Sequence, residues 1–306
     1  MMKFSIHQAT SVGGRPVNED RVGYAYSREA LIMVLSDGMG GHAAGEVAAQ
    51  IALQSLIQAF RLHAKPRVDD PLSFLSQAII NAHYAILEYA RVNHIAGNPR
   101  ATVVTCLVQE GGYAWWAHVG DSRLYHVRRG KVLARTIDHS HAQLLIDQGV
   151  LSEAQLRTHD SRNRLYCSLG GETLPHIDFG RRTVLQPGDV IALCSDGLWG
   201  VLDDEEIAER LTRAPLVRVV PELVEQAEME AGPNSDNVSL IAMRWEEGVP
   251  ADPGEDTVST ETLALDQVTT AFSVPHQPTF SAEPMDAEEI ERAIREINET
   301  IQKFKG

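Results

Sequence analysis

The sequence predicts an α+β fold, arranged as one large domain followed by a tail. Segments 31–35 and 190–194 are uninterrupted apolar runs, typical of strands buried on both faces. Between 101 and 127, short apolar segments alternate with turn residues, which predicts antiparallel hairpins. Segments 43–60 and 72–89 repeat apolar residues at helical spacing, which indicates two amphipathic helices packed together.

Composition limits the kind of partner. The 306 residues are 43% hydrophobic and 23% charged, and the net charge is -15, about half of it beyond Gly248. An acidic chain without a Lys/Arg cluster argues against binding to nucleic acid or to an anionic membrane. The sequence lacks both a signal peptide and a run of the about 18 apolar residues that span a bilayer, so we expect a cytoplasmic protein. Its three cysteines are expected to be reduced thiols.

Both apolar strands lead into the sequence Ser-Asp-Gly, which places Asp37 and Asp196 at strand ends. A single Asp-Gly is a common turn dipeptide. The repetition, and the glycines that let the backbone approach closely after Asp37, favour a site that the two aspartates share.

The N-terminal segment contains a polar loop at 13–21, between an opening strand and a strand at 22–26. A plain loop explains its composition. In the functional interpretation, Arg15 supplies a bidentate clamp for phosphate, while Glu19 and Asp20 face a metal site.

Two further aspartates lie beside strands. Asp121 occupies a turn between hairpin strands, where turn chemistry alone explains an aspartate. Asp236 directly precedes the last predicted strand, 238–245, and helices are predicted before it at 203–213 and 217–231.

A third helix is predicted at 142–149, just after two histidines, His139 and His141. Their spacing of two, without a third histidine or a thiolate nearby, does not favour zinc. A helix cap by Asp138 or Ser140, with the two histidines solvated, is the better explanation of this polar segment.

Asp37, Asp121, Asp196 and Asp236 thus lie at strand margins drawn from the whole chain. Clustered carboxylates without a cation repel one another, whereas Mg²⁺ or Mn²⁺ is held by carboxylates, a backbone carbonyl such as that of Gly38, and waters. Two such ions about 3.5 to 4 Å apart lower the pKa of a bridging water, which can attack a phosphoryl group in line. This chemistry requires no protein nucleophile.

Six short motifs follow one another within residues 1–247: Asn-Glu-Asp at 18–20, Asp-Gly-Met-Gly-Gly-His at 37–42, Gly-Asp-Ser-Arg at 120–123, Asp-His-Ser at 138–140, Ser-Asp-Gly-Leu at 195–198 and Ser-Asp-Asn at 235–237. In this order they resemble the motifs of the metal-dependent protein serine/threonine phosphatases of the protein phosphatase 2C family, in its bacterial branch. The resemblance implies a four-layer αββα sandwich over 1–247. Its two antiparallel sheets carry helices on both outer faces, with a binuclear metal site at one end.

The resemblance also implies ligands for two tightly bound Mn²⁺ or Mg²⁺ ions. Asp37 is similar to the carboxylate that bridges the ions, Gly38 to the residue that offers a carbonyl, and Asp196 and Asp236 to the other direct ligands. Asp121 resembles the ligand of a weaker third ion.

Other positions match residues that act on water or phosphate. Glu19 and Asp20 resemble outer-sphere residues that act through bound water, and Arg15 resembles the phosphate-binding arginine. Met39 departs from the eukaryotic relatives, which carry a histidine proposed as general acid there; a methionine has no proton to donate. Residues 139–165 correspond to the variable flap beside the site. The residues expected near the site are Asp138, His139, Ser140, Arg162 and Asn163.

The activity implied is hydrolysis of phosphoserine and phosphothreonine in proteins by a metal-activated water, opposing a bacterial Ser/Thr kinase. One alternative is a phosphatase-like regulator that binds phosphoproteins without turnover, which the complete set of carboxylates disfavours. Another is a two-metal phosphoesterase acting on small phosphoesters, which the acidic charge does not exclude.

The tail has a pattern of its own. Residues 248–284 are rich in Pro, Thr, Ser, Asp and Glu, which predicts a flexible linker. In 285–305, isoleucines and a phenylalanine recur at spacings of four and three, typical of an amphipathic helix. A helix this short is marginal alone in water, so we expect the catalytic domain, a second copy or a partner protein to cover it.

Overall fold

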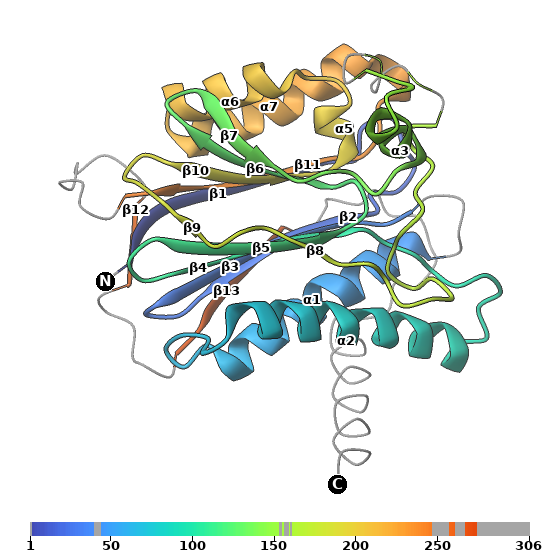
Figure 1. Cartoon of the computed structure of the whole chain (residues 1–306), viewed down its shortest axis with the longest axis horizontal. Helices are drawn as coiled ribbons and strands as arrows, with labels where there is room; N and C mark the ends of the chain where they lie inside the picture. The colour runs from blue at the N-terminus through green and yellow to red at the C-terminus, as the bar shows by residue number, and fades with distance from the viewer. Residues whose placement is uncertain are drawn as a thin grey trace, which may run out of the picture.

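The computed structural model describes residues 2–39, 44–152, 155, 159, 161–246, 257–260 and 267–273. Within them, two antiparallel sheets pack face to face and helices cover both outer faces (Figure 1). This arrangement confirms the predicted four-layer sandwich.

The first sheet has the strand order β12-β1-β11-β10-β6-β7. Its strands are β12 (Thr257–Ser259), β1 (Lys3–Ser11), β11 (Val238–Trp245), β10 (Val190–Cys194), β6 (Arg123–Arg128) and β7 (Lys131–Arg135). The second sheet has the order β13-β2-β3-β4-β5-β8, and β9 also pairs with β5. Its strands are β13 (Thr269–Ser273), β2 (Asp20–Tyr26), β3 (Ala30–Asp37), β4 (Val103–Gln109), β5 (Tyr113–Val119), β8 (Asp178–Phe179) and β9 (Thr183–Val184).

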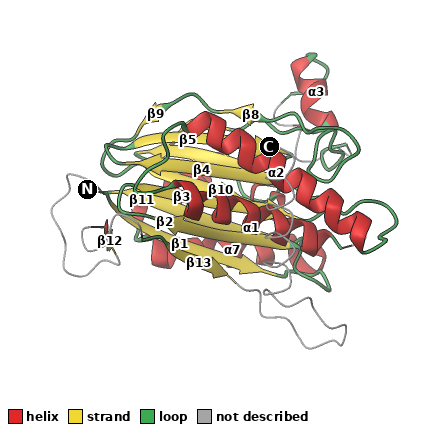
Figure 2. Cartoon of the chain, turned by 90° about the horizontal axis from the view of Figure 1, so that it is seen from below, coloured by secondary structure: helices red, strands yellow, loops and turns green. Residues whose placement is uncertain are grey.

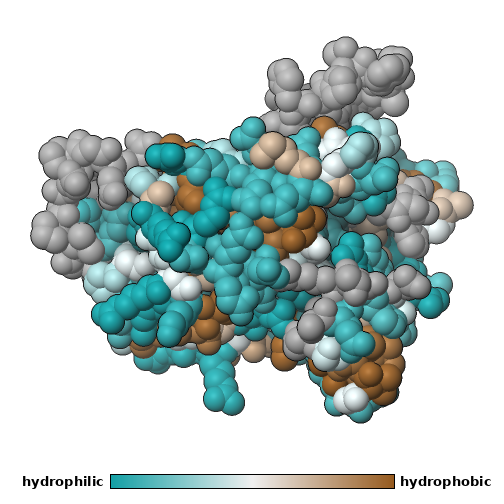
Figure 3. Space-filling view, turned by 90° about the horizontal axis from the view of Figure 1, so that it is seen from above, coloured by the Kyte–Doolittle hydropathy of each residue, from teal (hydrophilic) through white to brown (hydrophobic). Residues whose placement is uncertain are grey.

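The helices form the outer layers. Seen from below, α1 (Gly45–His63) and α2 (Pro71–Val92) lie across the second sheet (Figure 2). The first sheet is covered by α6 (Asp204–Arg213) and α7 (Leu216–Ala231), after the short α5 (Asp196–Trp199) and before the 3-10 turn η1 (Gly232–Asn234). The exposed side of this layer is mostly hydrophilic, as expected for amphipathic helices (Figure 3). Helix α3 (His141–Asp147) stands apart, at the edge of the sandwich.

Strand β3 shows why its sequence is apolar throughout. Its alternate residues Ile32 and Val34 pack in the cluster beneath α1 and α2, whereas Leu31, Met33 and Leu35 pack in the cluster between the sheets. A strand that is buried on both faces has no position left for a polar side chain until it reaches its end at Asp37.

Two strands lie within the range that the sequence assigned to a linker. Strand β12 pairs with the edge strand β1, and β13 pairs with the edge strand β2. The backbone N–H of Thr260 bonds the carbonyl of Met2, and its hydroxyl bonds the carbonyls of Met2 and Arg28. For residues 257–260 and 267–273 the chain therefore departs from a flexible linker, because unpaired sheet edges offer partners that a polar segment can use. The predicted helix at 285–305 lies outside the described residues.

Two smaller expectations can be compared with the structure. Cys106, Cys167 and Cys194 carry free thiols. No helix in the part of the chain that the structure describes is long and apolar enough to cross a bilayer.

Candidate metal centre and phosphate site

A pocket of about 400 Å³ opens where strand ends from both sheets meet at one end of the sandwich. Five carboxylates line it together with an arginine, a glycine backbone and a methionine. They are Glu19, Asp37, Asp121, Asp196, Asp236, Arg15, Gly38 and Met39. The sequence therefore located the residues of one pocket from motifs spread between positions 15 and 236.

Asp37 and Asp20 lie opposite each other at the ends of β3 and β2. One oxygen of Asp20 accepts a hydrogen bond from the hydroxyl of Ser195, at 2.7 Å. Ser195 belongs to the segment between β10 and α5, in the other layer of strands, so this bond joins the two sheets beside the pocket. Asp196, the next residue, begins α5 and is carried into the pocket by the same segment.

Asp236 is held beside the N-terminal loop. The guanidinium of Arg15 donates a hydrogen bond to the Asp236 carboxylate at 2.8 Å, and the backbone N–H of Gly14 bonds both the carbonyl and the hydroxyl of Ser235. Gly13 has a φ of 59°, and a Cβ there would lie 2.2 Å from the carbonyl oxygen of Asp236. Only glycine allows this close approach of the two loops.

Gly38 is fixed by the start of α1. A Cβ on Gly38 would lie 2.4 Å from the carbonyl group of Gly45, so the two backbones touch directly. The backbone N–H of Gly38 bonds the carbonyl of Glu19 at 3.2 Å. The backbone after Asp37 is thus held rigidly at the pocket wall, where a carbonyl oxygen can serve as a ligand.

Asn237 organises the loop that carries Glu19. Its side-chain oxygen accepts the N–H of Glu19 at 2.8 Å, and its amide donates to the carbonyls of Val12 and Val17. The sequence analysis quoted Asn237 and Ser195 within motifs but assigned them no role. Ser195 precedes Asp196 and Asn237 follows Asp236, and this adjacency was the signal in the sequence that could have identified them.

Among the described residues, five carboxylates line the pocket beside a single arginine, Arg15. Burial, followed by the neighbouring Asp20 and Asp196, raises the pKa of Asp37 well above its usual range. Burial and the charge of Asp236 raise the pKa of Asp196 to about 7. Burial also raises the pKa of Glu19 to about 7, with a further contribution from Glu46.

The donor set fits a hard divalent cation. Its atoms are carboxylate oxygens and one backbone carbonyl, without thiolate or imidazole, which is the chemistry that Mg²⁺ and Mn²⁺ prefer. The second oxygen of Asp20 is buried and has no hydrogen-bond partner among the described residues. A bound water in the pocket would satisfy it, as expected for an outer-sphere residue.

The flap residues separate into two groups. Asn163 lines the pocket, and the positive charge of Arg162 lowers the pKa of Asp196, so these two lie at the site as expected. Asp138, His139 and Ser140 do not line the pocket. The hydroxyl of Ser140 accepts the N–H of Gln143 and caps α3, which confirms the predicted helix cap.

His139 forms a second cluster with His118 and Asp178, whose ligand-type atoms lie within 4.8 Å of one another. The N–H of Gly120 donates to Nδ1 of His139 at 3.2 Å, which places the imidazole proton on Nε2, facing Asp178 at 3.2 Å. Hydrogen bonds therefore account for both nitrogens of His139. His139 is buried, however, with 1% of its surface exposed, so the expectation of a solvated histidine is wrong for this residue.

The chain is similar to a known protein family and to characterised relatives over the part of the sequence that carries most of these residues. The family profile described as protein phosphatase 2C matches residues 12–235. The chain is 32% identical over 228 residues to the serine/threonine protein phosphatase PstP of Mycobacterium tuberculosis, covering 74% of this chain and 42% of that protein. It is 30% identical over 246 residues to the protein phosphatase PhpP of Streptococcus pneumoniae, covering 78% of this chain and 97% of the relative.

A solved structure shares the architecture. The catalytic domain of PstP in complex with two manganese ions matches with a TM-score of 0.68 and 28% identity, over 80% of this chain and all of that one. The chain thus spans less than half of the full mycobacterial relative and nearly all of the streptococcal one. Since the profile matches well over half of the chain and includes the pocket residues from Arg15 to Asp196, the chain belongs to the protein phosphatase 2C family.

Proposed function

We propose that this chain is a Mn²⁺- or Mg²⁺-dependent hydrolase of phosphoserine and phosphothreonine in proteins. The observation that carries the proposal is the convergence of Arg15 with Asp37, Asp196 and Asp236 on one pocket whose carboxylates lack matching positive charge. A phosphoryl group is the substrate moiety that such a pocket, once charged with cations, is suited to bind.

Each residue has a distinct task. Asp37, Asp196, Asp236 and the carbonyl of Gly38 hold two ions, and the chemistry that this pair supplies when bound is activation of a water for in-line attack. Asp121 holds a weaker third ion. The structural relative described as a complex with two manganese ions supports a pair of ions.

Water and phosphate are positioned by the outer residues. Glu19 and Asp20 orient bound waters, since one lies at the pocket wall and the other behind it. The side chain of Arg15 is half exposed at 52%, so its guanidinium can turn from Asp236 to a phosphate oxygen. Met39 lines the pocket but carries no transferable proton, so the leaving oxygen takes its proton from water.

Substrates and partners follow from the same proposal. Arg162 and Asn163, at the rim, contact the phosphorylated segment of a protein, and a Ser/Thr kinase supplies that substrate. The predicted helix at 285–305 docks on the catalytic domain, on a second copy or on a partner. A cytoplasmic location is part of the proposal.

Turnover of para-nitrophenyl phosphate and of phosphoserine and phosphothreonine peptides, with and without Mn²⁺, tests the function. We expect turnover of all three that is abolished by chelation and restored by Mn²⁺. Binding of the phosphopeptides without turnover would instead support a phosphoprotein-binding regulator, and turnover of the small ester alone would support a small-molecule phosphoesterase.

A further inference from the structure

Arg123, the first residue of β6, is a charged side chain with only 1% of its surface exposed. Burying a guanidinium is costly unless its N–H groups find partners. The Asp138 carboxylate accepts two parallel bonds from it, at 2.9 and 2.8 Å, and a third N–H faces the Tyr125 hydroxyl at 3.4 Å and Asp204 at 3.5 Å. Each of the three guanidinium nitrogens therefore faces a partner.

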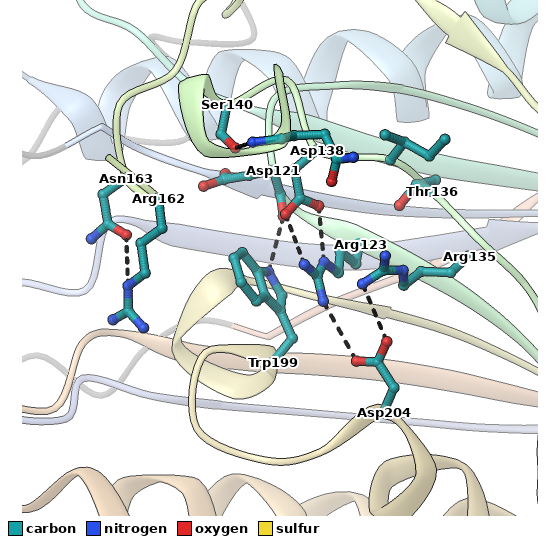
Figure 4. Close-up of polar contacts among 12 residues, drawn as sticks. Asp121, Arg123, Arg135, Thr136, Asp138, Ser140, Arg162, Asn163, Trp199 and Asp204 are labelled. Atoms are coloured by element: carbon teal, nitrogen blue, oxygen red, sulfur yellow. Dashed lines mark hydrogen bonds and ion pairs between the residues drawn. The ribbon is translucent and has the colours of Figure 1, made fainter. Parts of the chain in front are cut away.

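Its flat face has another neighbour. The guanidinium lies 3.7 Å from the ring centre of Trp199, and the indole N–H of Trp199 donates to the main-chain oxygen of Asp121 at 2.9 Å. Figure 4 shows Arg123 between Asp138 and Trp199, with Asp121 above the indole. Arg123 thus does not line the pocket itself, yet it packs against the side chain that bonds the main chain of Asp121.

The same contacts fix Asp121 relative to Asp196. Trp199 ends the helix α5 that Asp196 begins, so a rigid turn of helix separates the indole from this carboxylate. Asp121 and Asp196 line the same pocket, and two carboxylates that share a site repel each other. Holding them at a fixed spacing against this repulsion requires external support, which the Arg123–Trp199 stack provides.

The opposite side of Arg123 leads to the base of the flap. His139 donates its backbone N–H to the carbonyl of Gly120 at 2.9 Å, and Asp138, the residue before it, grips Arg123. The Asp121 turn and the first residues of the flap are consequently joined through one buried arginine.

We propose that Arg123 is a positioning residue that sets the affinity of the Asp121–Asp196 side of the pocket for its third divalent ion, acting through Trp199. The proposal rests on the proposed function for the existence of that ion. Residues behind metal ligands commonly change metal affinity by about 10- to 100-fold when they are replaced.

Two variants remove different contacts of the Arg123–Trp199 stack. Arg123→Lys keeps the positive charge but loses the bidentate hydrogen bonds to Asp138 and the planar stack on Trp199. Trp199→Phe keeps a ring beneath the guanidinium but loses the N–H that holds the carbonyl of Asp121. Arg128→Lys is the matched control. Arg128 ends the same strand and donates an equivalent pair of hydrogen bonds to Asp189, at 2.7 and 2.7 Å, away from the pocket.

Calorimetric titration with Mn²⁺ is the primary measurement, accompanied by the Mn²⁺ dependence of para-nitrophenyl phosphate turnover and by urea unfolding. In Arg123→Lys and Trp199→Phe we expect the two tight ions to bind within threefold of the parent affinity. The weak ion should bind about tenfold less tightly, and the Mn²⁺ concentration for half-maximal turnover should rise in parallel. Arg128→Lys should lower stability without moving any Mn²⁺ affinity.

Several results would overturn the proposal: an unchanged weak site in Trp199→Phe, an equal loss of tight and weak ions, an equal shift in Arg128→Lys, or a parent protein with no third ion. Each of these results leaves the proposed two-ion chemistry of the parent protein intact. Failure of the proposed function shows instead as absence of metal-dependent turnover in the parent protein.

Discussion

Arg15 and Asp236, 221 positions apart in the chain, are joined by a hydrogen bond of 2.8 Å. The residue expected to bind phosphate is thus held by a residue expected to bind metal. The Asp236 carboxylate raises the pKa of Arg15, so the guanidinium stays charged while it waits beside the pocket. In the proposed function, Arg15 would turn from Asp236 to phosphate, and Asp236 would be left to hold an ion.

Replacement of Arg15 by lysine should weaken substrate binding while the ions stay in place. We expect KM for para-nitrophenyl phosphate to rise about tenfold with a smaller fall in kcat, because an ammonium group cannot contact two phosphate oxygens in the fork geometry. Steady-state kinetics at saturating Mn²⁺ measures this. An unchanged KM would remove Arg15 from phosphate binding.

Replacement of Asp196 by asparagine should reduce kcat by several orders of magnitude, because a direct ligand and its charge are lost. The fold should survive and even gain stability under chelation, since burial and Asp236 already raise the pKa of this carboxyl to about 7. Turnover and urea unfolding with EDTA measure the two effects. Asp69→Asn, at an exposed position, is the control, and full activity of Asp196→Asn would contradict the ligand assignment.

Chelated protein should lose stability as the pH rises. Asp196 and Glu19 have a folded-state pKa raised to about 7, above the value of an unfolded carboxyl, so the folded form binds more protons between pH 4 and 7. Their contribution is fully present below about pH 4 and declines as the pH rises through 7. Unfolding free energies at pH 5, 6, 7 and 8 with EDTA should therefore fall over this range, and Mn²⁺ should flatten the dependence. A rise in stability with pH under EDTA would disprove this electrostatic account.

Two truncations separate the edge strands from the remaining tail. A chain ending after residue 273 retains β12 and β13, whereas one ending after 247 leaves β1 and β2 as open edges. We expect the longer form to match the parent in urea unfolding and small-ester turnover. The shorter one should unfold at lower urea and associate in light scattering while retaining turnover at low temperature. Equal stability of the two forms would show that the edge strands contribute little.

The sequence predicted best where one residue pattern has one structural meaning. Segment 31–35 had to be a strand buried on both sides, and Asp37 had to stand at its end, because no polar residue interrupts the run. The six motifs then located the pocket. The orientation of the flap base could not be predicted, since Asp138 is drawn away from the pocket by Arg123, a residue distant in sequence and buried by the fold.

Strands β12 and β13 could not be predicted for a different reason. They are only three and five residues long, too short for an alternating pattern to stand out, and their pairing is decided by the unpaired edges of β1 and β2. Likewise, Ser195 could be read only as part of a turn, whereas its hydroxyl in fact bonds Asp20 across the two sheets. Such contacts are properties of the assembled layers, and the local sign of this one is that Ser195 adjoins Asp196.

The metal site needs strands from both sheets to be in place. Asp20 lies beside Asp37 through the strand register and bonds Ser195 of the other sheet, so the protein can bind metal only after the sheets have assembled. The pocket needs residues from Arg15 to Asp236, so a chain that ends before Asp236 lacks part of it, and on the ribosome the pocket is completed only late in synthesis. Ions that bind solely to the completed sandwich stabilise the native state and not the folding transition state. Metal loading should consequently slow unfolding while leaving the folding rate unchanged, so that the cofactor stabilises the native protein kinetically only after it has folded.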